Sequence, residues 1–229
     1  MTALYLTQVR ALSLVAAASV AVFAFVRLRQ GRALEGALVT VAGAALVAGS
    51  YLWAVDVGGQ SLADRFMGLI DNGVLRTFDE HRGLFLRYTL SDLVYEFPFG
   101  AGLGRWGTMY VYFGDPTLWQ APPIHAEIQI TGWLLDGGVP LWVLYGGALF
   151  AAVRFSHMVA IRAGSESLRD SAAAVLCIQL AIIGLSLAGP VFNTQLGIVF
   201  WAVTGALFGS AVESDDGPDD MAAHEGRDA

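Results

Sequence analysis

Five long apolar segments dominate this sequence, and they constrain the fold more than any other feature. They cover approximately residues 9–27, 35–54, 130–152, 171–189 and 194–212. Each approaches the roughly 20 residues that a helix needs to cross a bilayer. Only 14% of the residues are charged, against about 25% in soluble domains. We therefore predict an all-α integral membrane domain over residues 1–212 with about five transmembrane helices.

Arginines between these segments predict the orientation in the membrane. Three lie between the first two segments and three between the third and fourth: Arg27, Arg29 and Arg32, then Arg154, Arg162 and Arg169. Short loops rich in arginine remain on the cytoplasmic side. This predicts a multi-pass protein of the cytoplasmic membrane whose N-terminus, residues 55–129 and the turn 190–193 face outward. The acidic residues 213–229 would form a disordered cytoplasmic tail.

Charge and cysteine content exclude several classes of function. The formal net charge of −7 gives no basis for nucleic-acid binding. The single cysteine, Cys177, gives neither a disulfide framework nor metal-ligand spacing, so we expect no metal site. Glycines between Gly100 and Gly104 are followed by no lysine, which excludes a P-loop. The apolar segments carry almost no ionisable residue at their centres, which disfavours a transporter.

The outward segment 55–129 is too long for a plain connection, and we predict that it is structured. Leu86, Leu90, Leu93 and Phe97 recur at helical spacing while charged residues take the other positions. This pattern predicts an amphipathic helix lying on the outer membrane surface. The helix would end before Pro98, and the glycines of residues 100–104 would form a flexible turn.

Arginine and histidine in outward positions suggest a site for an anionic group. Arg10 stands at the outer end of the first apolar segment, where the charge rule gives it no reason to be. Arginine matches phosphate oxygens with a planar fork of donors, and histidine accepts a proton near neutral pH. His125 follows two prolines directly before the third segment, whereas His81 reads as an exposed polar residue. Such a site would bind a phosphorylated headgroup and activate a hydroxyl beside it.

Four motifs in order resemble a known family. They are TQVRALSL at the start of the first span, ADRFMGLID, HRGLFLRYTLSDLVYEFPFGAGLGRWG, and PPIHAEIQITGWLLDGGVPLWVLY. Together they resemble the carboxy-terminal half of the O-antigen ligase and O-antigen polymerase family of bacterial membrane proteins. The resemblance covers roughly residues 5–150. Members usually have about twice as many spans, so a second membrane chain could supply the missing helices.

This resemblance implies a glycosyltransferase without metal or cofactor. It would move a glycan from undecaprenyl pyrophosphate to an acceptor hydroxyl on the outer side of the bilayer. His125 would act on the acceptor hydroxyl, Arg10 would contact the pyrophosphate, and either Arg82 or Arg87 would be the catalytic loop arginine, with Arg82 slightly favoured. Further sugar or acceptor contacts would come from four loop residues: Glu127, Arg105, Tyr110 and Trp119.

Two alternatives remain open from the sequence. Polymerase and ligase differ only in the acceptor, which is another lipid-linked glycan in one case and a lipid or protein in the other. A non-catalytic membrane partner that keeps the loop as a glycan-lipid-binding module is the alternative to an enzyme. Tyr110 and Trp119 fit sugar stacking and interfacial anchoring equally well.

Overall fold

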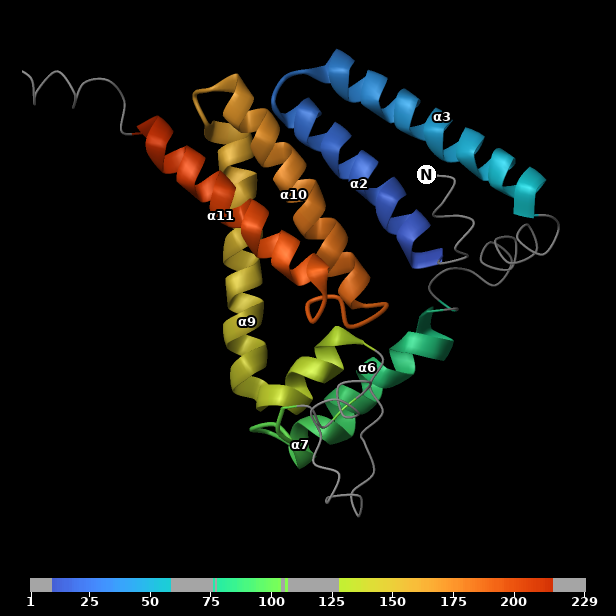
Figure 1. The fold of residues 1–229 in the computed structure, drawn as a ribbon, viewed down its shortest axis with the longest axis vertical. Coiled ribbons are helices and arrows are strands. Elements are labelled where there is room, and N and C mark those ends of the chain that lie inside the picture. The colour runs from blue at the N-terminus through green and yellow to red at the C-terminus, as the bar shows by residue number, and fades with distance from the viewer. Residues whose placement is uncertain (1–9, 59–75, 77, 104–105, 107–127, 216–229) are drawn as a thin grey trace, which may run out of the picture.

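The computed structural model describes residues 10–58, 76, 78–103, 106 and 128–215, and these form helices and no β-strand (Figure 1). The predicted all-helical class is confirmed. Two helices precede the long loop, one irregular helical segment lies within it, and three helices follow. In order they are α2 (Arg10–Arg29), α3 (Ala33–Gly58), η1 (Asp79–Gly83), α6 (Leu84–Tyr88), η2 (Thr89–Leu93), α7 (Val94–Glu96), α9 (Gln129–Arg162), α10 (Glu166–Ser186) and α11 (Gln195–Asp215).

Four helices in the described part of the chain are long and apolar enough to cross a membrane. They cover Ala33–Val57, Gln129–Arg162, Glu166–Ser186 and Gln195–Glu213. The helix α2 occupies the place of the first predicted span and is not among these four. The C-terminal boundary also differs, because α11 continues to Asp215, three residues beyond the predicted end at 212.

The helix α10 lies at the centre of the bundle and packs against α9, α2 and α11, while α3 packs mainly on α2 (Figure 1). Alanines allow the close approach of the central helices: Ala160, Ala172 and Ala173 are each fully buried. Small residues at helix contacts are typical of membrane bundles, where packing and not water exclusion drives association.

Large apolar side chains cover the outside of this bundle. Leu34 on α3, Leu144 on α9 and Ile198 on α11 each expose more than 70% of their surface. Monomeric soluble proteins rarely expose contiguous apolar surface of this extent. The described helices therefore have an apolar outer surface of the kind that suggests a membrane protein.

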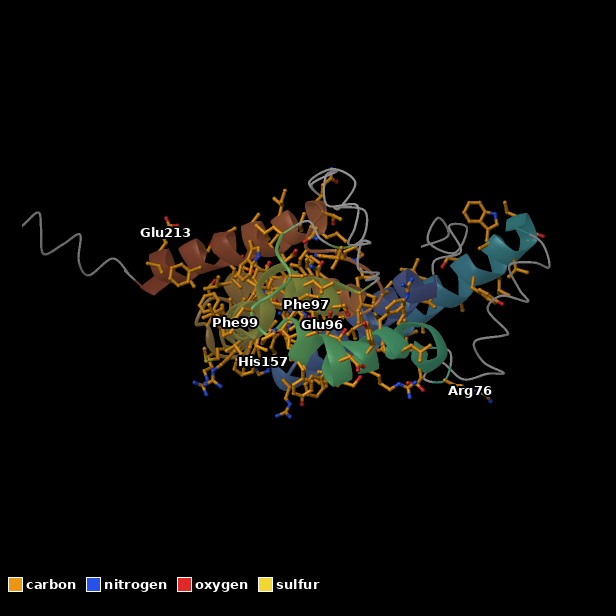
Figure 2. The ribbon with its side chains drawn as sticks, turned by 90° about the horizontal axis from the view of Figure 1, so that it is seen from below. Arg76, Glu96, Phe97, Phe99, His157 and Glu213 are labelled. Atoms are coloured by element: carbon orange, nitrogen blue, oxygen red, sulfur yellow. The ribbon has the colours of Figure 1, made fainter. Side chains whose placement is uncertain are left out.

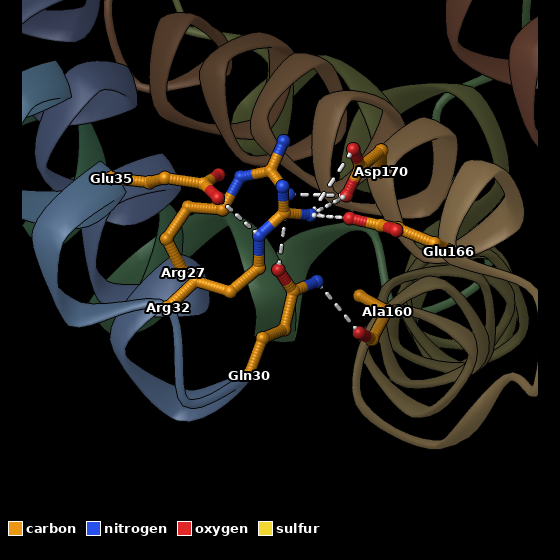
Figure 3. A network of polar contacts seen from close by, with 7 residues as sticks. All are labelled: Arg27, Gln30, Arg32, Glu35, Ala160, Glu166 and Asp170. Atoms are coloured by element: carbon orange, nitrogen blue, oxygen red, sulfur yellow. Dashed lines mark hydrogen bonds and ion pairs between the residues drawn. The ribbon is translucent and has the colours of Figure 1, made fainter.

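A network of ion pairs ties the two arginine-containing links together at one end of the bundle (Figure 3). Arg27 on α2 donates to the Asp170 carboxylate on α10, and the Arg32 Nη1 lies 2.7 Å from the Glu166 Oε1. The Gln30 Nε2 donates to the Ala160 carbonyl at 2.9 Å. The hydrogen bond with Glu35 raises the pKa of the Arg32 guanidinium, so this residue stays charged at any physiological pH.

The links themselves are shorter than the sequence indicated. Residues 30–32 join α2 to α3, and residues 163–165 join α9 to α10. Arg27 and Arg29 belong to the last turn of α2, where cations favour the negative end of the helix dipole. Both links lie at the same end of the bundle, which is the arrangement that the positive-inside rule requires.

We expect Asp170→Ala to destabilise the bundle, because it leaves the Arg27 guanidinium buried without its carboxylate. Arg27 is only 8% exposed. Breaking a fully buried pair costs about 3–5 kcal/mol, and the partly exposed Asp170 reduces this to about 1–3 kcal/mol. Thermal unfolding in detergent should show a lower midpoint. The matched control is Asp56→Ala, which removes an exposed carboxylate from α3 and should leave the midpoint unchanged.

Candidate functional site

The end of the bundle opposite the ion-pair network is organised by a kink in α9. Gly138 has φ 66° and ψ −159°, a conformation open essentially to glycine alone. The kink divides α9 into a short first part, residues 129–137, and a long second part, residues 139–162. The Trp142 Nε1 donates to the Ile130 carbonyl at 2.7 Å and so fastens the two parts across the bend.

This kink corrects the third predicted span. The pattern predicted one uninterrupted crossing helix from residue 130, whereas the straight helix begins after Gly138. Pro140 lies in its first turn, where a residue without an N–H costs nothing. Asp136 and Gly137 therefore lie immediately before the bend.

The glycine turn after the loop helix packs directly onto the kink. The Val139 N–H donates to the Pro98 carbonyl at 2.9 Å, and the Ala101 N–H donates to the Leu135 carbonyl at 2.7 Å. Gly100 has φ 90°, and a Cβ built on it would lie 2.9 Å from the Gly137 nitrogen. The turn predicted at this position is confirmed, but it is not free, since hydrogen bonds fix its backbone to α9.

Trp106 completes this contact. Its ring is 2% exposed and covers Gly132, where any side chain would overlap the indole. The Trp106 Nε1 donates to the Asp136 Oδ1 at 2.8 Å. Leu93, Leu134 and Leu135 form the rest of this small core. Asp136 thus has a structural role, because it orients the indole that joins the loop to α9.

The amphipathic helix forms as predicted in position but not in its buried face. The segment Asp79–Glu96 contains two π-helical turns, η1 and η2, and each rotates the residues that follow it relative to a regular α-helix. The apolar residues were predicted to lie on the membrane, whereas Leu93 is buried within the protein, Leu90 is 51% exposed and Thr89 is fully buried. The Thr89 and Thr131 hydroxyls share a hydrogen bond of 2.6 Å. The buried face therefore contacts α9.

The start of α9 is held as firmly as the kink. Ile128 and Gln129 are both fully buried. The Gln129 Oε1 accepts from the Phe192 N–H at 3.0 Å, and its Nε2 lies 3.4 Å from the Asn193 Oδ1. These bonds tie α9 to the connection between α10 and α11. His125 precedes Ile128 by three residues in the sequence, so only a short segment separates it from this fixed point.

Tilted and edge-on aromatic contacts surround the same point. The Trp133 and Tyr145 ring centroids lie 4.8 Å apart across the kink, and Phe192 packs 5.2 Å from Trp133. The Trp201 Nε1 on α11 donates to the Tyr145 hydroxyl at 2.9 Å. The cluster gives the bend of α9 a rigid backing from the connection and from α11.

Two of the predicted site residues lie on the loop helix. Arg82 is half-buried on η1, and Arg87 is exposed on α6. The Arg87 Nη2 lies 2.9 Å from the Asp79 Oδ2 of the same segment. Arg10 is the first residue of α2 and so belongs to the end of the bundle opposite Arg27, where the loop helix also lies (Figure 1). The structure does not describe the Arg10 side chain.

The remaining predicted site residues lie outside the described part of the chain. They are the catalytic candidate and the four proposed contact residues: His125, Glu127, Arg105, Tyr110 and Trp119. Their convergence with the arginines stays a prediction. Among the described side chains, no three His, Cys, Asp or Glu residues gather as metal ligands would.

Sequence reasoning missed the structural role of four residues at this end: Trp106, Asp136, Gln129 and Thr89. The signal for Asp136 was present, since it directly precedes two glycines and is followed four residues later by Pro140, a combination that favours a bend within a helix. Nothing in the local pattern marks Gln129 or Thr89, because their partners come from distant parts of the chain.

Comparison of this chain with protein families, with curated proteins and with solved structures finds no match. The family resemblance therefore depends on the sequence motifs alone.

Proposed function

We propose that this protein is a glycosyltransferase of the cytoplasmic membrane that transfers a glycan from undecaprenyl pyrophosphate to an acceptor hydroxyl on the outer side. One observation supports this most. The helix that carries Arg82 and Arg87 packs on the first part of α9, close to the fixed point from which the chain leads back to His125. A catalytic pair drawn from both segments would have a rigid base.

The proposed reaction needs three groups that this end of the molecule could supply. Arginines stabilise the charge that develops on the departing pyrophosphate, so this stabilisation needs no metal ion. His125 accepts the proton of the acceptor hydroxyl as that oxygen attacks the anomeric carbon of the donor. The apolar helices offer the polyprenyl chain a hydrocarbon environment. Polymerase and ligase activities both fit, since they differ in the acceptor alone.

Reconstitution tests this proposal directly. The full chain is placed in vesicles with a polyprenyl-pyrophosphate-linked oligosaccharide as the donor. The acceptor is either a second molecule of the same lipid-linked oligosaccharide or a lipid acceptor. We expect glycan transfer with release of polyprenyl pyrophosphate, without nucleotide and in the presence of a chelator. The control is the same mixture without the protein. Transfer that depended on an added nucleotide sugar would contradict the proposal.

A non-catalytic role is the second candidate, because the bundle described has about half of the spans that the resembling family usually has. In that case the loop would bind the lipid-linked glycan, and a second membrane chain would provide the missing helices. Binding of the donor lipid without any turnover, followed by turnover after addition of the second chain, would identify this role.

A further inference from the structure

Large apolar side chains remain exposed at the end of the loop helix and in the turn that packs on the kink of α9, and the packing of the loop helix does not explain them. Tyr95 is 80% exposed, and Phe99 and Leu103 are each 82% exposed. Figure 2 looks onto this end of the molecule and places Glu96, Phe97 and Phe99 together at one end of the loop helix, with Arg76 at the other. Phe97 is half-buried and packs with Leu93, so it is already used by the protein core.

The depth of these residues follows from the hydrogen bonds of the turn. The Pro98 carbonyl accepts from Val139, the first residue after the kink. From there to Arg162 the second part of α9 rises about 36 Å at 1.5 Å per residue, and the hydrocarbon core is about 30 Å thick. If Arg162 lies at one membrane surface, Val139 lies at the other. Phe99 is therefore held at the edge of the hydrocarbon.

The chemistry of the exposed apolar side chains fits that depth. Aromatic side chains favour the membrane interface, where a ring can rest among headgroups and upper acyl chains. Tyr95 follows Ser91 and Arg87 at intervals of one helical turn, so these three exposed residues share one face of the loop helix, whose arginine and serine suit the water side. Phe99 and Leu103, in contrast, belong to the turn after the helix. Val143 on the second part of α9 is also apolar and 66% exposed, as a helix continuing into the bilayer would require.

We propose that Phe99 and Leu103 insert into the outer membrane interface and contact lipid, so that the loop helix is anchored to the bilayer at the kink of α9. The anchored surface is not the leucine face predicted from the sequence, because Leu93 of that face is buried against α9. The inference depends on the membrane crossing by α9 that the proposed function also needs.

Site-directed fluorescence in vesicles tests this inference on the full chain. Cys177 is the only cysteine and is buried, so Cys177→Ala provides the background. Phe99→Cys, Ser91→Cys and Phe150→Cys are each labelled with an environment-sensitive dye. Phe150 is 68% exposed near the middle of the second part of α9 and reports the bilayer centre. Ser91 is exposed on the face of the loop helix that carries Arg87 and reports the water side.

We expect lipids brominated near the headgroup to quench the dye at Phe99→Cys, lipids brominated deep in the chain to quench it at Phe150→Cys, and aqueous iodide to quench it at Ser91→Cys. Quenching of the dye at position 99 by iodide would overturn the inference. A dye at position 99 that neither iodide nor brominated lipid quenches would also overturn it, because the residue would then be covered by protein. If lipids brominated deep in the chain do not quench the dye at position 150, both the inference and the membrane crossing by α9 are overturned. If they quench at position 150 but headgroup-brominated lipids do not quench at position 99, only the inference fails.

Discussion

Replacing His125 by alanine should abolish glycan transfer while the protein remains in the membrane at its normal level. The proposed histidine accepts the proton of the attacking hydroxyl, and loss of a general base typically lowers the rate by about 10²–10⁴-fold. The measurement is the amount of polymerised or ligated glycan in cells, or the initial rate in reconstituted vesicles. Binding of the donor lipid should be retained, since the arginines are unchanged.

The control for this prediction is a histidine that lies in the described part of the chain. His157 lies on α9 near the arginine links, at the end of the bundle away from the candidate site. His157→Ala should therefore leave transfer at the level of the parent protein. Equal transfer by the parent and by His125→Ala would remove the catalytic assignment, and the binding-partner role would then be favoured.

Replacing Gly138 by alanine should cause a large loss of stability. A Cβ at this position would lie 2.5 Å from the Phe99 Cα and 2.6 Å from the Gly100 nitrogen, and these are backbone atoms that cannot move aside. The positive φ adds strain of about 1–3 kcal/mol. We expect a total cost above about 4 kcal/mol, seen as a much lower unfolding midpoint in detergent.

Gly146 provides a matched control on the same helix. A Cβ built there meets nothing within 4 Å, and its φ is that of an ordinary helical residue. Gly146→Ala should therefore leave the midpoint unchanged or raise it slightly, because alanine favours the helix over glycine by about 1 kcal/mol. Similar midpoints for Gly138→Ala and Gly146→Ala would mean that the turn does not pack on the kink as described.

Helix positions could be predicted well because hydrophobicity and length are local properties. Each of the five predicted segments coincides with a helix, with ends displaced by up to about ten residues. The errors occur where distant residues decide. Leu90 was assigned with Leu93 to one apolar face from α-helical spacing, but the π-helical turns leave Leu90 exposed and bury Thr89 against Thr131. The hydrophobic pattern does not show where a π-helical turn occurs, because the turn is stabilised by contacts with another helix and not by the residues around it in the sequence.

The candidate site was predicted as residue types and not as an arrangement. The sequence indicated that arginines and a histidine lie in one outward segment, and the structure shows that the segment bearing Arg82 and Arg87 packs on the start of α9. It does not describe His125. That arrangement is supported by the contact of Trp106 with Asp136, which is 30 residues away in the sequence, and by the contact of Gln129 with Asn193, which is 64 residues away. Periodicity cannot reveal contacts between such distant residues.

The sequence by itself determined that this chain forms apolar helices with arginine at their shared end, because a bilayer demands about 20 apolar residues and cytoplasmic loops retain cations. Only the tertiary structure decided that α9 bends at Gly138 and that the glycine turn fastens to the bend. The reason is physical: a glycine permits a positive φ but does not require it. The Pro98 carbonyl and the Trp106 ring, brought from elsewhere in the chain, make that conformation the favourable one.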